Sequence, residues 1–425
     1  MTALKPKANI VVAGGGFAGL EAAFLLRNKL RDRARITLVS DQPQFLFKPN
    51  TIYLPFGGKL DPLVIELAHP TSKRNIEFVG GDVVGVDPDA RRLAVDGRSL
   101  SYDFLVLATG ASMAPAEIEG LETYGETIWT PQEMASLGRK LATAITSARQ
   151  GKQQQTILFT VPPGNKCAGP LYEIVLMTDT YLRRQNVRDR FELVWATYER
   201  TFIQAFGPKL HDVVVREFAK RDIDGNTEWV LDRVDESTAH YANGEIRAFD
   251  LLVAFPPYVA AVRYDGLPQD DRGFLKTELG TRRVVCHERL YAPGDAGDFP
   301  VKQAFLAFLQ ADASAEAIAA EIGTAPAVAR PFDPISMCVM EEFDTATFAQ
   351  VPLELTGDPA HPVAVRAHAN GTYKVGVSPL WRLGKKMLGL YLPFRFKAGQ
   401  PFHAGAPWRA MEIGLRGMSA TLARK

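Results

Sequence analysis

Residues 11–23 of the chain, VVAGGGFAGLEAA, decide how its first part folds. The β-rich residues 9–13 lead into a glycine turn at residues 14–19, and residues 20–29 then place apolar side chains at helical spacing. A second β-rich run follows at residues 35–40. The segment therefore predicts a strand, a helix and a parallel strand, which is a βαβ unit.

The turn has the spacing GxGxxG, formed by Gly14, Gly16 and Gly19. The first glycine permits a tight turn, the second lets a pyrophosphate approach the backbone, and the third lets the helix pack closely. With Phe17 and Ala18, these residues predict a dinucleotide site at a helix N-terminus. The alternative is a glycine-rich turn without a ligand.

The second strand ends in Ser40 and Asp41. A polar or acidic residue at this place hydrogen-bonds the adenosine ribose in dinucleotide-binding folds. An isolated Asp at a strand end is otherwise turn chemistry. Pro49 and Val83 are also predicted to contact the cofactor.

The composition excludes several classes of protein. With 425 residues, 49 Lys and Arg and 48 Asp and Glu, the chain is long enough for two or three domains and has no net field to attract nucleic acid. Three cysteines are too few for a secreted disulfide scaffold. Because we find neither a cleavable export signal nor an apolar run long enough to cross a bilayer, we expect synthesis and folding in the cytoplasm.

Two further segments identify the cofactor. YDFLVLATG at residues 102–110 and LYAPGDAGD at residues 290–298 resemble the recurrent segments of the FAD-dependent pyridine nucleotide-disulfide oxidoreductase superfamily. The resemblance implies that FAD is bound near the ATG turn and that Asp295 holds the ribityl chain. The predicted FAD contacts in these segments are Ala108, Thr109, Gly110, Gly294 and Asp295.

This resemblance implies an α/β fold of two Rossmann-like domains of the glutathione-reductase type. We place the FAD domain at residues 1–112 and 285–325, and the second domain at residues 113–284. Residues 326–425 form a C-terminal region that carries a redox cysteine and associates with membrane and quinone.

The second domain lacks the glycine motif that binds NAD(P)H in most of that superfamily. Its first strand, TILFTV, leads instead into PPGNKCAGPLYE at residues 162–173, so we expect that electrons do not come from NAD(P)H. This loop carries Cys167, close to the start of a predicted helix at residues 172–182, where the helix dipole would favour a thiolate. The alternative for Cys167 is a small buried apolar residue.

Segments along nearly the whole chain resemble sulfide:quinone oxidoreductase and the flavoprotein subunit of flavocytochrome c sulfide dehydrogenase. They are ITLVSDQPQFLFKPN, the Cys167 loop with PLYE, FDLLVAFPPY, PVKQAF and ISMCVMEEFD. The resemblance implies that Cys167 and Cys338 face each other at the flavin and form a disulfide or polysulfide bridge. It makes Cys338 the flavin-facing thiolate and Cys167 the persulfide carrier.

The same resemblance makes Glu173 an acid/base residue and gives Lys302 the task of neutralising charge on the reduced flavin or near the quinone. The alternatives are a solvated helix face for Glu173 and an ordinary surface charge for Lys302. The chain departs from the family at Trp129, where well-known members have a third cysteine. Cys286, in a predicted strand before GDAGD, is interpreted as structural, and no His/Cys spacing indicates a metal site or attached haem.

From residue 379 onward, basic residues alternate with large apolar ones. The basic residues are Arg382, Lys385, Lys386, Arg395, Lys397, Arg409, Arg416, Arg424 and Lys425, with Glu412 as the one acid. This pattern predicts an amphipathic element lying on a membrane surface. The alternative is a helix packed on the first domain with a solvated basic face.

Together these features predict FAD-dependent oxidation of sulfide by a peripheral membrane protein, with membrane quinone as electron acceptor. Three other functions stay open: a flavocytochrome c-type sulfide dehydrogenase, a type-II NADH:quinone dehydrogenase, and a membrane flavoprotein that senses redox state without turnover. Sulfide, quinone and the membrane surface are the expected partners, nucleic acid is not, and a homo-oligomer stays open.

Overall fold

The computed structural model describes residues 7–151, 153–323, 329–359, 361–369 and 371–423. Its first sheet has five parallel strands in the order β20-β9-β1-β2-β5. Their bounds are Leu290–Tyr291 (β20), Phe104–Leu107 (β9), Ala8–Ala13 (β1), Ala34–Ser40 (β2) and Glu77–Gly80 (β5). Because β20 lies far along the chain, the chain leaves this sheet and later returns to it.

Helices α1 (Phe17–Leu30) and α7 (Ala304–Glu321) pack together on one face of this sheet. The alanines of α7, among them Ala311 and Ala315, are buried against α1 and let the two helices approach closely. An antiparallel sheet covers the other face and consists of β6 (Val83–Asp87), β7 (Arg92–Val95) and β8 (Arg98–Ser101).

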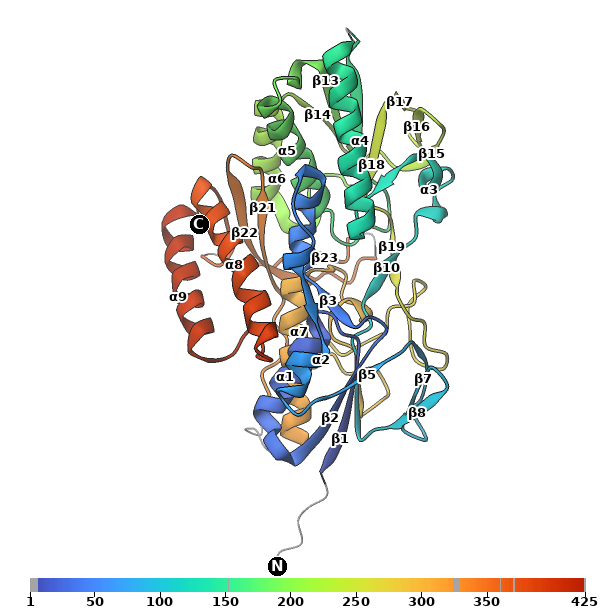
Figure 1. The fold of residues 1–425 in the computed structure, drawn as a ribbon, viewed down its shortest axis with the longest axis vertical. Coiled ribbons are helices and arrows are strands. Elements are labelled where there is room, and N and C mark those ends of the chain that lie inside the picture. The colour runs from blue at the N-terminus through green and yellow to red at the C-terminus, as the bar shows by residue number, and fades with distance from the viewer. Residues whose placement is uncertain (1–6, 152, 324–328, 360, 370, 424–425) are drawn as a thin grey trace, which may run out of the picture.

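The second sheet is also parallel, in the order β11-β18-β12-β13-β14. Its strands are Glu126–Thr127 (β11), Leu251–Ala254 (β18), Gln155–Val161 (β12), Phe191–Thr197 (β13) and Ile223–Asn226 (β14). One face packs on α4 (Pro131–Gln150), α5 (Gly169–Arg184) and α6 (Gly207–Arg221). The two sheets with their helices (Figure 1) confirm the predicted fold class of two Rossmann-like domains.

An antiparallel sheet that the sequence did not predict follows the FAD domain. It contains β21 (Ile335–Glu341), β22 (Ala346–Leu355), β23 (Val363–Val365) and β24 (Lys374–Val377). The chain then ends in two helices, α8 (Pro379–Lys397) and α9 (Gly405–Leu422), which lie together on one side of the molecule (Figure 1). No helix in the described ranges is long and apolar enough to span a membrane.

One local prediction needs correction. Cys286 lies in an exposed turn with φ 65°, and not in a strand, so this residue is not part of the core. The predicted domain boundary at residues 325/326 and the basic residues Arg424 and Lys425 lie outside the described residues.

A buried ion-pair network ties the second domain to the C-terminal sheet. Arg221 of α6 is 3% exposed and contacts Asp179 of α5 at 3.2 Å, Glu217 at 3.3 Å, and Glu342 and Asp344 after β21 at 3.0 and 2.8 Å. Charges buried in this way require mutual pairing, because their desolvation is costly. The network therefore fixes how α5, α6 and β21 meet.

Replacing Arg221 by Leu should destabilise the protein by about 3 kcal/mol, because it leaves buried carboxylates without their cation. Urea unfolding of the purified protein measures this change. The matched control is Arg416→Ala, which breaks an exposed pair with Glu412 and should cost less than about 1 kcal/mol. Equal effects of the two substitutions would contradict the structural role of the network.

Candidate functional site

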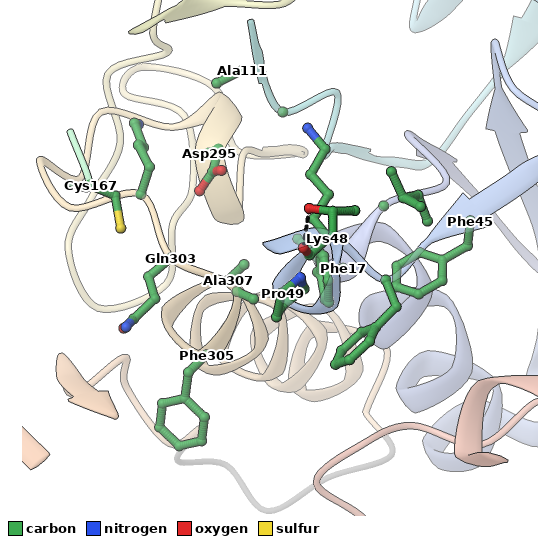
Figure 2. Close-up of a pocket in the computed structure, with 18 of the residues that line it drawn as sticks. Phe17, Phe45, Lys48, Pro49, Ala111, Cys167, Asp295, Gln303, Phe305 and Ala307 are labelled. Atoms are coloured by element: carbon green, nitrogen blue, oxygen red, sulfur yellow. Dashed lines mark hydrogen bonds between the residues drawn. The ribbon is translucent and has the colours of Figure 1, made fainter. Parts of the chain in front are cut away.

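A cavity of about 1050 Å³ lies where the strands of the first sheet end at their carboxyl termini. In parallel α/β folds this edge is where ligands bind. The cavity continues past the second domain and β21 to the C-terminal helices. Figure 2 shows Cys167, Asp295 and Lys48 lining it from three separate segments.

The glycine turn forms one end of the cavity. Gly14 has φ +115°, and a Cβ there would lie 2.1 Å from the Ala108 carbonyl oxygen. A Cβ on Gly19 would lie 1.8 Å from the carbonyl oxygen of Gly14. Next to Gly16, by contrast, no atom of the described chain lies within 4 Å of that position, so this side is open to a ligand. These contacts fit the three roles expected of the motif.

The predicted cofactor residues gather around this cavity. Those that line it are Gly14, Gly16, Phe17, Ala18, Ser40, Asp41, Pro49, Val83, Ala108, Thr109, Gly110, Asp295 and Lys302. Gly19 and Gly294 do not line it. Gly294 has φ +77°, and a Cβ there would meet the Ala18 side chain at 2.8 Å, so both glycines serve backbone packing.

Buried charges line the middle of the cavity. Burial raises the pKa of Asp295, and the neighbouring Lys302 and Lys48 oppose that rise. Lys302 is 3% exposed and donates to the Gly297 carbonyl oxygen, which excludes the alternative of an ordinary surface charge. Burial lowers the pKa of Lys302 to about 7. The acid and the cation that the family resemblances implied therefore both lie in this cavity.

The structure brings Cys167 and Cys338 to the same cavity. Cys167 lies in the loop between β12 and α5, and Cys338 lies in β21. The loop is held in place because the Cys167 N–H donates to Asn165 Oδ1 at 2.9 Å and the Asn165 amide donates to the Phe255 carbonyl at 2.9 Å. Negative charge on Cys167 would raise the pKa of Cys338, as expected of groups close in space.

The prediction that the environment of Cys167 favours a thiolate is wrong. Burial raises the pKa of Cys167 to about 12, and the carboxylates of Asp295 and Glu173 raise it further. One backbone N–H, from Gly169, acts in the opposite direction. Burial likewise raises the pKa of Cys338 to about 12. Desolvation outweighs the helix dipole here, so uncharged sulfur is the favoured form.

Glu173 is buried at 8% exposure, which excludes the alternative of a solvated helix face. Its carboxylate pairs with Lys385 of α8 and accepts the backbone N–H of Glu341 at 2.7 Å. Burial raises the pKa of Glu173, and Lys385 opposes this rise. A carboxyl group with this balance can exchange a proton beside the two thiols.

Sequence reasoning missed Lys385 and Lys48 as pocket residues. Lys385 was assigned to a basic membrane-facing surface because basic and apolar residues alternate there, but it is 8% exposed. Arg395 is also buried, and Arg382 turns inward to Glu341 at 2.6 Å. The sequence pattern does not show on which face of α8 each cation lies, because basic and apolar residues occur all around the helix.

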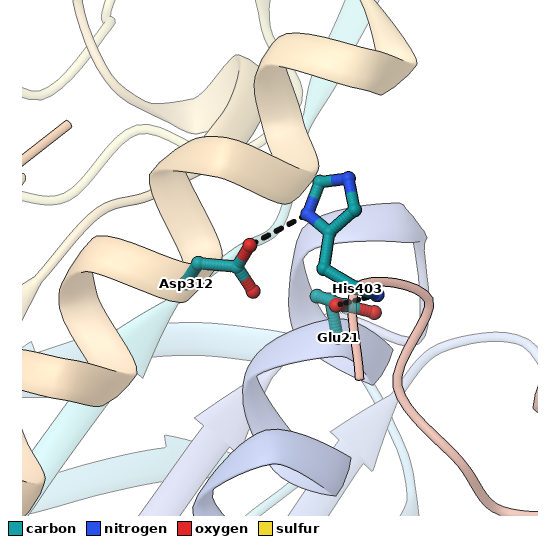
Figure 3. Close-up of side chains that lie close together, drawn as sticks. All are labelled: Glu21, Asp312 and His403. Carbon is teal, nitrogen blue, oxygen red and sulfur yellow. Dashed lines mark hydrogen bonds and ion pairs between the residues drawn. The ribbon is translucent and has the colours of Figure 1, made fainter. Parts of the chain in front are cut away.

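A cluster of titratable side chains lies outside the cavity (Figure 3). Ligand atoms of Glu21, Asp312 and His403 lie within 4.8 Å of one another. Glu21 is fully buried and accepts the backbone N–H groups of Phe402 and His403, at 2.5 and 3.1 Å, and His403 Nδ1 lies 2.6 Å from Asp312. The cluster therefore holds the α8–α9 linker on α1 and α7. That the chain has no metal site stays a prediction.

Known proteins are similar to this chain in sequence. Residues 8–156 match the family model described as pyridine nucleotide-disulphide oxidoreductase. A sulfide-quinone reductase of Aquifex aeolicus (strain VF5) is 32% identical over 222 residues, which cover 51% of this chain and 50% of that relative. The mitochondrial sulfide:quinone oxidoreductase of Dictyostelium discoideum is 24% identical over 320 residues, covering 71% of this chain and 68% of that protein.

The fold itself is shared with the crystal structure of the sulfide:quinone oxidoreductase from Aquifex aeolicus. The TM-score is 0.80 at 22% identity, and the match covers 96% of each chain. In the sequence comparison, the chain spans about half the length of the sulfide-quinone reductase of Aquifex aeolicus.

The fold, the glycine turn and the ATG and GDAGD segments define a flavoprotein that binds a dinucleotide at the first of two Rossmann-like domains. In sequence, residues 8–156 are similar to the pyridine nucleotide-disulphide oxidoreductases, and the chain shares the fold of a sulfide:quinone oxidoreductase. FAD is the cofactor, and the open Gly16 backbone and the buried Asp295 fit its pyrophosphate and ribityl groups.

Gly14→Ala should abolish FAD binding, because the new Cβ would collide with the Ala108 backbone at a φ that alanine rarely adopts. The expected result is purified protein with less than about a tenth of the wild-type flavin content, measured by flavin absorbance per protein. The control is Gly417→Ala in α9, where a Cβ meets no atom of the described chain. Full flavin content in Gly14→Ala would contradict the assigned turn.

Proposed function

We propose that the protein oxidises sulfide and passes the electrons through FAD to a membrane quinone. One observation carries the proposal. Two cysteines from distant segments, Cys167 and Cys338, line the FAD cavity, and the Cys167 loop occupies the place where a second glycine turn would bind NAD(P)H. Thiols beside a flavin suit two-electron sulfur chemistry.

The reaction begins with a sulfur bridge between the two cysteines. Hydrosulfide attacks the sulfur of Cys167, one S–S bond breaks and another forms, and Cys167 carries a persulfide while Cys338 leaves as a thiolate. Closing a new bridge, longer by one sulfur atom, joins the persulfide to Cys338 and releases two electrons and one proton. FAD, when bound, accepts these two electrons.

The charges around the thiols support this sequence. Uncharged sulfur is favoured over thiolate at both cysteines because burial raises the pKa of each to about 12. The thiolate released at Cys338 therefore draws a proton, which Glu173 supplies and takes back when the new bridge closes. Lys385 stabilises the Glu173 carboxylate that remains and lowers the pKa of Cys338. Glu173 and Lys385 thus form a proton-exchanging pair beside the flavin.

The far end of the cavity supports a quinone as acceptor. Here the lining is apolar and aromatic and comes from the C-terminal segments: Leu388, Leu392, Phe402, Trp408 and Leu415. A quinone has a flat ring and an apolar tail, which an apolar slot can hold. The same cavity reaches from this end to the FAD residues, so no separate electron path is required.

Helix α8 supports attachment to a membrane surface because it is apolar on two faces. One face is buried in the protein through Trp381, Leu392 and Phe396. The other face is exposed and repeats at helical spacing through Leu380, Leu383, Met387, Leu390 and Phe394, which are 49–75% exposed. Such an apolar stripe on a surface helix marks a contact with lipid or a partner. The exposed cations Lys386 and Lys397 of α8 suit anionic head groups.

Cys338→Ser and Cys167→Ser should each lower sulfide-driven flavin reduction by at least about 100-fold while leaving FAD bound, because the sulfur bridge can no longer form. Anaerobic titration with sulfide, followed by flavin absorbance, measures this loss. The matched control is Cys286→Ser, at an exposed turn, which should behave as wild type.

Two further measurements distinguish the proposed enzyme from a redox sensor and from a type-II NADH dehydrogenase. Sustained quinol formation with sulfide and decylubiquinone is expected, whereas a redox sensor would reduce its flavin once and stop. Flavin reduction by NADH in place of sulfide would point to a type-II NADH dehydrogenase. Unchanged reduction in Cys338→Ser would remove the two-thiol mechanism.

Replacing Leu383, Leu390 and Phe394 together by Gln should lower binding to lipid vesicles by at least about 100-fold, because each exposed side chain loses its transfer into lipid. Co-sedimentation with vesicles that contain anionic lipid measures binding. The control is Ile246→Gln with Leu355→Gln, two exposed apolar residues outside α8 that do not line the cavity. If both variants bind like wild type, the stripe on α8 is not the attachment surface.

A further inference from the structure

Trp129 lines the cavity and takes no part in the proposed sulfur chemistry. The structure places the ammonium of Lys48 3.2 Å from the centroid of the Trp129 ring. Both side chains line the FAD cavity. An ammonium at this distance over an indole face is a strong cation–π contact, and tryptophan is the best ring for it.

Lys48 is otherwise without a close partner. Within the described ranges, no hydrogen-bond acceptor or carboxylate contacts its Nζ. Burial lowers the pKa of Lys48 to about 8, and the charges of Asp295 and Glu133 oppose this fall. An ammonium group has three donors and no acceptor function. A half-buried lysine whose donors face a cavity therefore indicates an electron-rich or negatively charged group in that cavity.

The other lysine beside Asp295 is already engaged. Lys302 donates to the Gly297 carbonyl oxygen and lies over the Phe274 ring at 3.8 Å. Lys385, farther along the cavity, pairs with Glu173. Among the lysines of this cavity, Lys48 thus has donors that the described chain leaves free.

Trp129 is held firmly enough to position Lys48. Its backbone N–H donates to Glu133 Oε2 at 2.6 Å, next to the capping box that starts α4. Its ring lies edge-on to Tyr258 at 5.5 Å and near Phe255 at 6.3 Å. A side chain without a ring at position 129 would offer Lys48 no face, so the contact depends on the indole.

We propose that Lys48 is a cation that stabilises the negative charge of reduced FAD, and that Trp129 is the residue that positions it. The cavity wall then contributes to the redox potential of the flavin through a cation–π contact. This inference requires FAD in the cavity but does not depend on sulfide or quinone being the substrates.

The test is the midpoint potential of the bound flavin, measured anaerobically against indicator dyes without sulfide or quinone. In Lys48→Met the ratio of reduced to oxidised flavin at a fixed potential should fall about tenfold, which for two electrons is a shift of about 30 mV to lower potential. Lys48→Arg keeps the charge and should stay within about 10 mV of wild type.

Trp129→Leu removes the ring face and should lower the same ratio about threefold, whereas Trp129→Phe should restore most of the wild-type potential. The double variant Lys48→Met with Trp129→Leu should equal Lys48→Met alone, because Trp129 acts through Lys48. Flavin content per protein shows that each variant is folded and loaded. A merely structural role of Trp129 would change stability but not this non-additive pattern of potentials.

Unchanged potentials in both Lys48→Met and Trp129→Leu would overturn the inference. In that case the anion that Lys48 binds would be the substrate. Lys48→Met would then require a higher half-saturating concentration of hydrosulfide while the flavin potential stayed unaltered. Shifted potentials in a protein that fails to oxidise sulfide would support the role of Lys48 and refute only the proposed function.

Discussion

The structure depends on the close approach of two backbone segments, the glycine turn and the end of β9. Gly14 lies so near the Ala108 carbonyl that no side chain fits between them, and Gly19 lies as near to Gly14. Gly294 then meets Ala18, which brings the segment with Asp295 to the same point. Because glycine alone permits these contacts, α1, the ATG turn and the start of α7 converge on one cofactor site.

Burial of charge shapes the chemistry around this point. The same low-dielectric wall raises the pKa of the two cysteines and lowers that of Lys302 and Lys48. In each case desolvation favours the uncharged form of the group. A charge is therefore stable only where a partner or a cofactor compensates it. Glu173 with Lys385 is the compensated pair beside the thiols. In such a cavity, proton exchange in the proposed reaction would depend on the compensated pair of Glu173 with Lys385.

The C-terminal region joins that chemistry to the surface. Helix α8 contributes Lys385 to the cavity and exposes Leu390 and Phe394 on its opposite side. The Glu21, Asp312 and His403 cluster fastens the following linker to the FAD domain, and Phe402 from this linker lines the cavity. A single helical layer therefore closes the site and presents the apolar surface. This arrangement explains why a basic, apolar sequence contains both buried and exposed cations.

The sequence by itself determined the features that depend on neighbouring residues. The turn at Gly14, Gly16 and Gly19 and the parallel strands are local patterns, and the structure agrees with both. The pairing of Cys167 with Cys338 came from family resemblance and not from spacing. It needed long-range contacts that no local pattern records.

The tertiary structure alone decided which charges are buried and what they meet. The contact of Lys48 with Trp129, the pair of Glu173 with Lys385 and the antiparallel sheet that carries Cys338 join segments far apart in the chain. Their energies depend on solvent exclusion, which arises only when those segments pack together. The prediction of a thiolate at Cys167 was wrong for this reason. A helix dipole acts locally, whereas desolvation depends on how the whole protein folds.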